Sequence, residues 1–229
     1  MRKSYYIVVL VLVGYLLGQL RALPSVADTA RSEAPAPKQQ RVGLQVGHWL
    51  NADLPDEFRN KLAYSLGGEV NGLTEWELCL DIAQRTKTKL ESDGYAVDLL
   101  PATVPENYLA DAFLSLHTDG NDDTTVRGYK VAATAWDETS RSTELSEAVQ
   151  VALGSAADLP TSSYISEEMN EYYAFNFTKY DHAVSPSTPA VIVELGFLTN
   201  RDDRQYLVYS SDQVAESLRQ GVNSFLDSN

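Results

Sequence analysis

Short apolar runs of strand length alternate with helical segments from residue 41 to the end of the chain. This alternation predicts a single α/β domain, in which a largely parallel or mixed, twisted sheet carries helices on both faces. The expected strands are residues 42–46, 95–100, 112–116, 128–136 and 190–195. The expected helices are residues 75–91, residues 142–153 and a closing helix, capped by Ser211 or Asp212, with Val214, Leu218, Gly221 and Phe225 on one side.

The first 40 residues have a different composition from the rest. Arg2 and Lys3 precede an uncharged, almost wholly apolar stretch from Tyr5 to Leu20, which is typical of exported proteins. Its length lies between that of a signal-peptide core and the roughly 20 residues of a membrane span, so a cleaved signal peptide and an uncleaved membrane anchor both stay open. We therefore expect a signal peptide or anchor over 1–23, a flexible linker over 24–40, and a folded domain over 41–229 outside the cytoplasm.

The charge and the cysteine content exclude several kinds of protein. The formal net charge is −14, and no cluster of Lys or Arg follows the first few residues. Nucleic acids and anionic lipid surfaces are therefore not expected as partners, apart from possible membrane anchorage through the N-terminal segment. The single cysteine, Cys79, excludes an intramolecular disulfide and falls on the apolar stripe of a predicted helix.

The segment 75–91 carries clear signals for both ends of a helix. Thr74, followed by Glu77 three residues later, predicts a capping box. Gly94 is suited to the left-handed turn that ends many helices. Within this helix Glu75 shares the apolar side with Cys79, whereas Glu77 lies on the polar side and is explained by its capping role.

Two of the three histidines, His48 and His117, directly follow predicted strands. In open α/β sheets the carboxyl ends of the strands form the ligand-binding edge. Each histidine alone is more often a structural residue, but a pair at one edge favours a shared site. Glu75 is the third candidate, because a carboxylate on an apolar helix face needs a cation nearby. Two imidazoles and one carboxylate, with water in the fourth position, form a known type of catalytic zinc site.

A second glutamate, Glu194, is embedded in the otherwise apolar segment 189–197. Burial should raise the pKa of this carboxyl group toward neutrality, where it could act as a general acid/base. The alternative is a structural glutamate that is satisfied by backbone donors or an arginine.

Four sequence blocks, in this order, resemble the zinc-dependent N-acetylmuramoyl-L-alanine amidases of bacterial cell walls. They are Val-Gly-His at 46–48, Gly-Leu-Thr-Glu at 72–75, Leu-Ser-Leu-His at 114–117 and Pro-Ala-Val-Ile-Val-Glu-Leu-Gly-Phe-Leu-Thr-Asn at 189–200. The last block is the most specific, and the resemblance extends over residues 41–226.

The resemblance implies that His48, Glu75 and His117 bind Zn²⁺ and that Glu194 is the catalytic carboxylate. The implied substrate is peptidoglycan, cleaved in the cell envelope at the amide between N-acetylmuramic acid and L-alanine. Two rivals stay open: a zinc peptidase that cuts peptidoglycan peptides, and a catalytically silent wall-binding module. The second is worth keeping because this chain lacks the usual Asp-Pro before and Gly-Gly after Gly47-His48.

Residues 154–189 form a long insert that is dense in aromatic side chains. They are Tyr164, Tyr172, Tyr173, Phe175, Phe177 and Tyr180, with the third histidine, His182, near the end. The insert could pack down as a satellite hydrophobic cluster or contact glycan or peptide. His182 is a candidate for substrate contact, with an ordinary surface histidine as the alternative.

Overall fold

The computed structural model describes residues 39–51, 54–63, 65, 67–137, 139–155, 159–162 and 165–228. The N-terminal segment 1–23 and most of the expected linker lie outside these residues. The folded unit runs from Gln39 to Asn229. Of the helices in the described ranges, none combines the length and apolarity that a membrane crossing requires.

Five strands form one mixed sheet in the order β4-β1-β5-β7-β6. Their bounds are β1 Arg41–Val46, β4 Ala96–Leu100, β5 Ala112–Asp119, β6 Lys130–Ala133 and β7 Ala190–Phe197. Strands β4, β1, β5 and β7 pair in parallel, and β6 pairs with β7 in antiparallel fashion at one edge. This confirms the predicted α/β class with a mixed main sheet.

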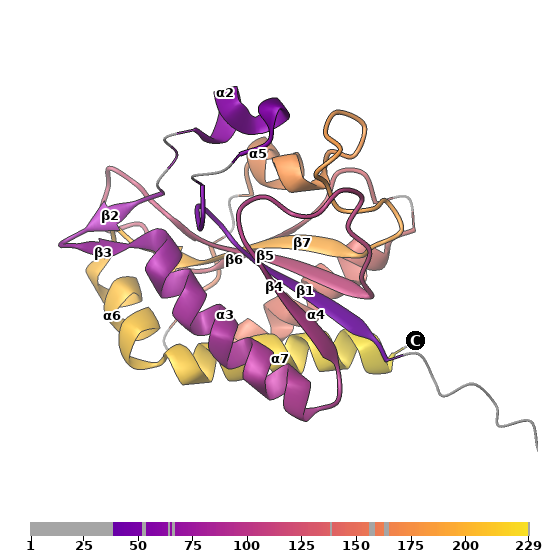
Figure 1. Cartoon of the computed structure of the whole chain (residues 1–229). Helices are drawn as coiled ribbons and strands as arrows, with labels where there is room; N and C mark the ends of the chain where they lie inside the picture. Colours follow the sequence, from indigo (N-terminus) through magenta and orange to yellow (C-terminus); the bar gives the residue numbers. More distant parts are fainter. Residues whose placement is uncertain are drawn as a thin grey trace, which may run out of the picture. The chain divides into compact units, whose positions relative to one another are not determined.

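The two faces of the sheet are covered differently (Figure 1). One face carries the long helices α3 Glu75–Ser92, α4 Arg141–Gly154 and α7 Ser211–Asp227, together with α6 Arg201–Tyr209. The elements on the other side are short: η2 Asp56–Phe58, α2 Arg59–Leu62, α5 Glu167–Asn170 and η3 Tyr173–Phe175. A small hairpin, β2 Glu69–Val70 and β3 Leu73–Thr74, leads into α3. Helices therefore flank both faces, but the long ones share one face.

The alternation of side chains along the strands explains this division. In β5, Leu114 and Leu116 point into the main core under the long helices, whereas Phe113 points into a second cluster under the aromatic insert. In β7 the same alternation sends Val193 to the helix side and Ile192 to the insert side. Successive residues of a strand face opposite sides, so both faces of this sheet are apolar.

The helix α3 is the element that the sequence predicted most closely. Thr74 and Glu77 form the capping box, with the Thr74 side chain accepting from the Glu77 backbone N–H. Gly94 adopts a φ of +99°, in the left-handed region. Cys79 is fully buried and Glu75 is 4 % exposed, while Glu77 is exposed, as the helix periodicity predicted.

Other details differ from the prediction. The strands β5 and β7 extend beyond the predicted runs to Asp119 and Phe197, because their pairing continues through His117–Glu194 and, after an irregularity, Asp119–Phe197. The predicted cap of the closing helix was one residue late: Ser210 is the N-cap and makes no side-chain bond. Helix α6 was not predicted, because it is only nine residues long and its apolar side chains are confined to residues 206–209.

Helices α4 and α7 approach closely at Gly221. A Cβ atom at this position would lie 2.8 Å from Cα of Val149, because the backbone of α4 occupies this space. We expect Gly221→Leu to lower the free energy of unfolding by about 1–3 kcal/mol or more, because the added side chain must push two packed helices apart. Urea unfolding measures this change. The matched control is Gln213→Leu on the exposed side of α7, which should change stability by less than about 0.5 kcal/mol.

Candidate functional site

His48 follows directly after β1 and has an unusual backbone conformation. Its φ is +61°, in the left-handed region, and Leu50 two residues later has a φ of +55°. The Nδ1 atom of His48 lies 3.0 Å from the carbonyl oxygen of Ser65. The Ser65 hydroxyl lies equally close to Nδ1, at 3.0 Å, and can donate or accept. The carbonyl oxygen only accepts, so a proton on Nδ1 satisfies both contacts and leaves the Nε2 lone pair free. The strained turn thus presents Nε2 to the edge of the sheet.

Glu75 is the first residue of α3 and brings its carboxylate to the same edge. One oxygen, Oε2, accepts from the backbone N–H of Gly68 at 3.0 Å. The other, Oε1, accepts from the backbone N–H of Thr118 at 3.2 Å and lies 2.9 Å from Nδ1 of His117. A buried carboxylate with several donors at a helix N-terminus is well compensated. The predicted inward orientation of Glu75 is therefore observed.

His117 lies in the last part of β5 and is 7 % exposed. Its ring occupies the space above Gly47, where a Cβ atom would overlap the imidazole. The rings of His48 and His117 meet edge to face with centroids 5.3 Å apart. The absence of a side chain at position 47 is therefore what allows the two imidazoles to converge.

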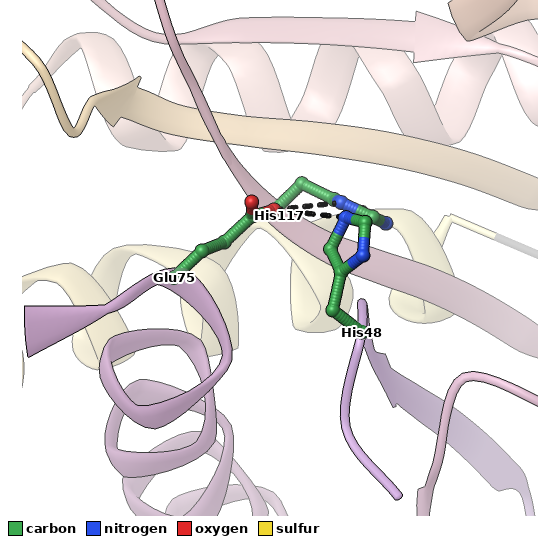
Figure 2. A group of neighbouring side chains, drawn as sticks. All are labelled: His48, Glu75 and His117. Carbon is green, nitrogen blue, oxygen red and sulfur yellow. Dashed lines mark hydrogen bonds and ion pairs between the residues drawn. The ribbon is translucent and has the colours of Figure 1, made fainter. Parts of the chain in front are cut away.

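The three side chains form one group (Figure 2). One possible ligand atom from each of His48, Glu75 and His117 lies within 4.8 Å of the others. The Oε1 atom of Glu75 is 2.9 Å from Nδ1 of His117 and 3.7 Å from Nε2 of His48. Among the described residues this is the group of His, Cys, Asp and Glu side chains that could hold a metal ion. The structure thus brings together the three residues that the sequence analysis proposed.

The ionisation of Glu75 and His117 is coupled through their contact. Burial acts to raise the pKa of Glu75, but the hydrogen bond with His117 and the nearby imidazoles lower it below its ordinary value. Burial acts to lower the pKa of His117, but the hydrogen bond with Glu75 and the charges of Glu194 and Glu75 raise it. The pair therefore favours a negative carboxylate beside a positive group, which is the environment that a bound cation would also satisfy.

Glu194 lies beside His117 in the sheet. The two residues are direct partners in the parallel pairing of β5 and β7, so their side chains leave the same face. The Oε2 atom of Glu194 is buried and has no hydrogen-bond partner within the described part of the chain. Burial, together with the charges of Glu75 and Asp119, raises the pKa of Glu194 to about 7, although His117 and Lys130 act in the opposite direction. One oxygen of this carboxyl group is therefore buried as predicted, while the residue as a whole is partly exposed.

Lys130 and Asp119 belong to the same site and were not predicted. Lys130 is the antiparallel partner of Glu194 on β6, is 6 % exposed, and forms an ion pair with Asp119 at the end of β5. Three polar side chains thus lie side by side in neighbouring strands, in the order His117, Glu194 and Lys130. The only sequence signal was a lysine within an apolar strand, and its partner could not be known without the strand order.

The aromatic insert packs onto the sheet beside this row. Tyr173 is buried and contacts Phe58 of η2 edge to face, with centroids 5.1 Å apart. The hydroxyl of Tyr172 lies 3.0 Å from Nε2 of His117. His182 is remote from the group: its Nδ1 lies 2.9 Å from Oε1 of Glu57, which also accepts from the His182 backbone N–H. The insert thus forms a packed cluster, and Tyr164 lies outside the described residues.

Cys79 takes no part in this chemistry. It is fully buried in the main core, and burial raises the pKa of its thiol well above the ordinary value. A neutral, inaccessible thiol is not a nucleophile.

Comparisons with known proteins agree on one family. The N-acetylmuramoyl-L-alanine amidase LytC of Bacillus subtilis is 31 % identical over 170 residues, which cover 68 % of this chain and 32 % of LytC. The chain therefore spans about a third of the length of this relative. An N-acetylmuramoyl-L-alanine amidase structure from Clostridium difficile 630 superimposes with a TM-score of 0.60 and 23 % identity, covering 83 % of this chain and 98 % of that one. The amidase AmiC2 of Nostoc punctiforme superimposes with a TM-score of 0.57 and 21 % identity, covering 82 % of this chain and 97 % of that one.

The match extends over almost all of the folded unit. The family model described as N-acetylmuramoyl-L-alanine amidase matches residues 47–224, a range that contains all four of the proposed site residues. The two superimposed structures share the fold. The chain belongs to the N-acetylmuramoyl-L-alanine amidase family.

Proposed function

We propose that this protein is a zinc-dependent N-acetylmuramoyl-L-alanine amidase that hydrolyses the amide between N-acetylmuramic acid and L-alanine in peptidoglycan. Membership of the family supports the reaction. The observation that carries the proposal for this chain is the convergence of His48, Glu75 and His117 beside a buried, unpaired carboxyl oxygen of Glu194. We further propose that the protein acts outside the cytoplasm, and that residues 1–23 export it as a signal peptide or membrane anchor.

The donor set suits zinc. Bonds of about 2.0–2.2 Å from Zn²⁺ to nitrogen and oxygen place tetrahedral ligands about 3–4 Å apart. The contacts of Glu75 Oε1 with the two histidines, 2.9 and 3.7 Å, lie in or near this range. Two imidazoles and one carboxylate leave a fourth position for water or substrate, as in catalytic rather than structural zinc sites. His48, Glu75 and His117 are therefore the proposed ligands.

The proposed division of labour follows from these positions. When bound, zinc would polarise the amide carbonyl and make water a stronger nucleophile. Glu194 accepts a proton from the attacking water as the new C–O bond forms. It then delivers this proton to the alanine nitrogen as the C–N bond breaks. The products are a lactyl carboxylic acid, which loses its remaining proton to solvent, and a free amine. A carboxyl group with a pKa near neutrality suits both steps. No covalent intermediate is required.

The reaction itself is tested with defined muropeptides and the purified protein. We expect products with the masses of a free lactyl sugar and an intact peptide. Glu194→Gln should reduce the rate by roughly 10²–10⁴-fold, because the amide cannot carry the proton, while zinc stoichiometry stays that of the parent. The matched control is Glu147→Gln on the exposed side of α4, which should leave the rate unchanged.

Three outcomes would contradict this proposal. Cleavage of peptide bonds with an intact lactyl amide would indicate a peptidase. Absence of turnover in the zinc-loaded parent would indicate a silent wall-binding module. Equal activity of the parent and Glu194→Gln would remove Glu194 from the acid/base role.

The raised pKa of Glu194 has a consequence for stability that needs no substrate. The folded pKa, about 7, exceeds the ordinary value of 4.5, so the metal-free folded state holds this proton more tightly than the unfolded state. Stability should therefore fall as pH rises between these values. Relative to Glu194→Gln, the chelator-treated parent should lose about 2–3 kcal/mol between pH 5 and pH 8 in urea unfolding. A difference that stays constant with pH would show that Glu194 titrates normally.

The close approach of Gly47 to His117 gives a test of the ligand set. A methyl group at position 47 would overlap the imidazole, so Gly47→Ala should displace His117 and weaken zinc binding by at least about 10-fold. Competition with a chromophoric chelator measures this affinity. Gly120→Ala is the control, because its Cβ would meet only Thr199 Cγ2 at 3.7 Å. Parent-like zinc affinity in a folded Gly47→Ala protein would exclude His117 as a ligand.

A further inference from the structure

Tyr172 makes a contact with the proposed metal centre that the proposed reaction does not use. It lies in the turn between α5 and η3, on the insert side of the sheet. Its hydroxyl is 3.0 Å from Nε2 of His117, and the two rings meet edge to face with centroids 5.3 Å apart. The Nε2 atom is on the side of the imidazole away from Glu75, which contacts Nδ1.

We propose that Tyr172 is a positioning residue, which holds the His117 imidazole so that Nδ1 is the atom that binds the metal. This inference rests on the proposed function of the site. It also assigns the aromatic insert a role beyond packing, because Tyr172 belongs to the insert and reaches a proposed ligand directly.

The chemistry of the hydroxyl fits this role. A phenol can both donate and accept a hydrogen bond. Without a cation, Nδ1–H of His117 donates to Glu75. The Tyr172 hydroxyl then donates to Nε2 of the neutral ring or accepts from Nε2–H of the protonated ring. If a cation took the place of the proton on Nδ1, the ring proton would lie on Nε2 and would be donated to the Tyr172 oxygen. The same contact therefore orients the ring with and without metal, as the outer partners of metal-binding histidines generally do.

The imidazole of His117 makes a hydrogen bond at each of its nitrogens. The ring also packs on Gly47, which has no side chain, and meets the His48 ring edge to face. Within the described ranges, the hydrogen-bond partner of Nε2 is the Tyr172 hydroxyl. The hydrogen bonds that orient the imidazole are therefore those with Glu75 at Nδ1 and Tyr172 at Nε2.

Tyr172 is itself held firmly. Its ring packs against Tyr173 and Phe175, with centroids 4.4 and 5.4 Å away. The hydroxyl of Tyr173 donates to the carbonyl oxygen of Ala102, which also accepts from Nε2 of Gln45 on β1 at 2.6 Å. The insert is thus anchored to the strand that precedes His48. A side chain fixed in this way can transmit a defined orientation to His117.

The test compares Tyr172→Phe with Tyr180→Phe in the full-length protein, with zinc as the only ligand. Both changes remove a tyrosine hydroxyl from the same insert, but only the Tyr172 hydroxyl contacts His117. We expect Tyr172→Phe to weaken zinc binding by about 10–100-fold in chelator competition, and Tyr180→Phe to change it by less than about threefold. Thermal unfolding of the metal-free proteins measures any general loss of stability separately.

A spectroscopic measurement addresses the imidazole directly. In the zinc-loaded parent, ¹⁵N NMR of His117 should show metal on Nδ1 and a protonated Nε2 whose proton exchanges slowly. Tyr172→Phe should accelerate that exchange. If Tyr172→Phe binds zinc within threefold of the parent, or if His117 binds through Nε2, the positioning role is wrong while the proposed amidase function stands. If the parent itself binds no zinc, the proposed metal site and this inference both fall.

Discussion

The parallel pairing of β5 with β1 on one side and β7 on the other determines where the chemistry of this protein lies. In this register Leu116 pairs with Val46, and His117 pairs with Glu194. Paired residues leave the same face of a sheet, so the imidazole and the carboxyl group stand side by side. A shift of one residue would turn His117 into the core under the long helices and expose Leu116 to the site. The packing of the core and the geometry of the site therefore depend on the same register.

Burying the charged groups of the site is unfavourable for the free energy of folding. Glu75 is almost fully buried and Glu194 has an oxygen without a partner, within a short distance of the Lys130–Asp119 ion pair. Isolated buried charges are unfavourable, and the fold offsets this with backbone donors to Glu75 and with the start of α3. A divalent cation would compensate the carboxylates further. The strained backbone of His48 also belongs to this cost, since positive φ values persist where surrounding contacts impose them.

The main hydrophobic core and the row of polar site residues lie on opposite faces of the sheet. The long helices α3, α4 and α7 bury most of the core on one face, where the contacts are apolar and closely packed. The other face carries Glu194, Lys130 and His117, covered in part by the aromatic insert. Much of the insert is irregular, and it is held by aromatic stacking and by the bonds of Glu57 to the backbone at 181–182. The insert can therefore make specific contacts with the site, while the main hydrophobic core lies on the other face of the sheet.

Much of this arrangement was accessible from the sequence, because it follows from local periodicity and from simple rules of sheets. The helix at 75–92, its capping box and the inward direction of Glu75 follow from a 3.6-residue repeat. The meeting of His48 with His117 follows from their positions at the carboxyl ends of neighbouring parallel strands. The desolvation of Glu194 follows from its apolar neighbours. The four sequence blocks led to the family that the comparisons confirmed.

The tertiary structure alone decided the rest. The Lys130–Glu194 neighbourhood required β6 to be antiparallel at the edge of the sheet, and the Tyr172–His117 contact joins residues 55 positions apart. Helix α6 is short, begins at the Asn200 cap and buries Asp203 and Leu207. These features arise from contacts between segments that are remote along the chain. Local patterns specify which face of an element is apolar, but only the packed arrangement specifies which polar groups meet.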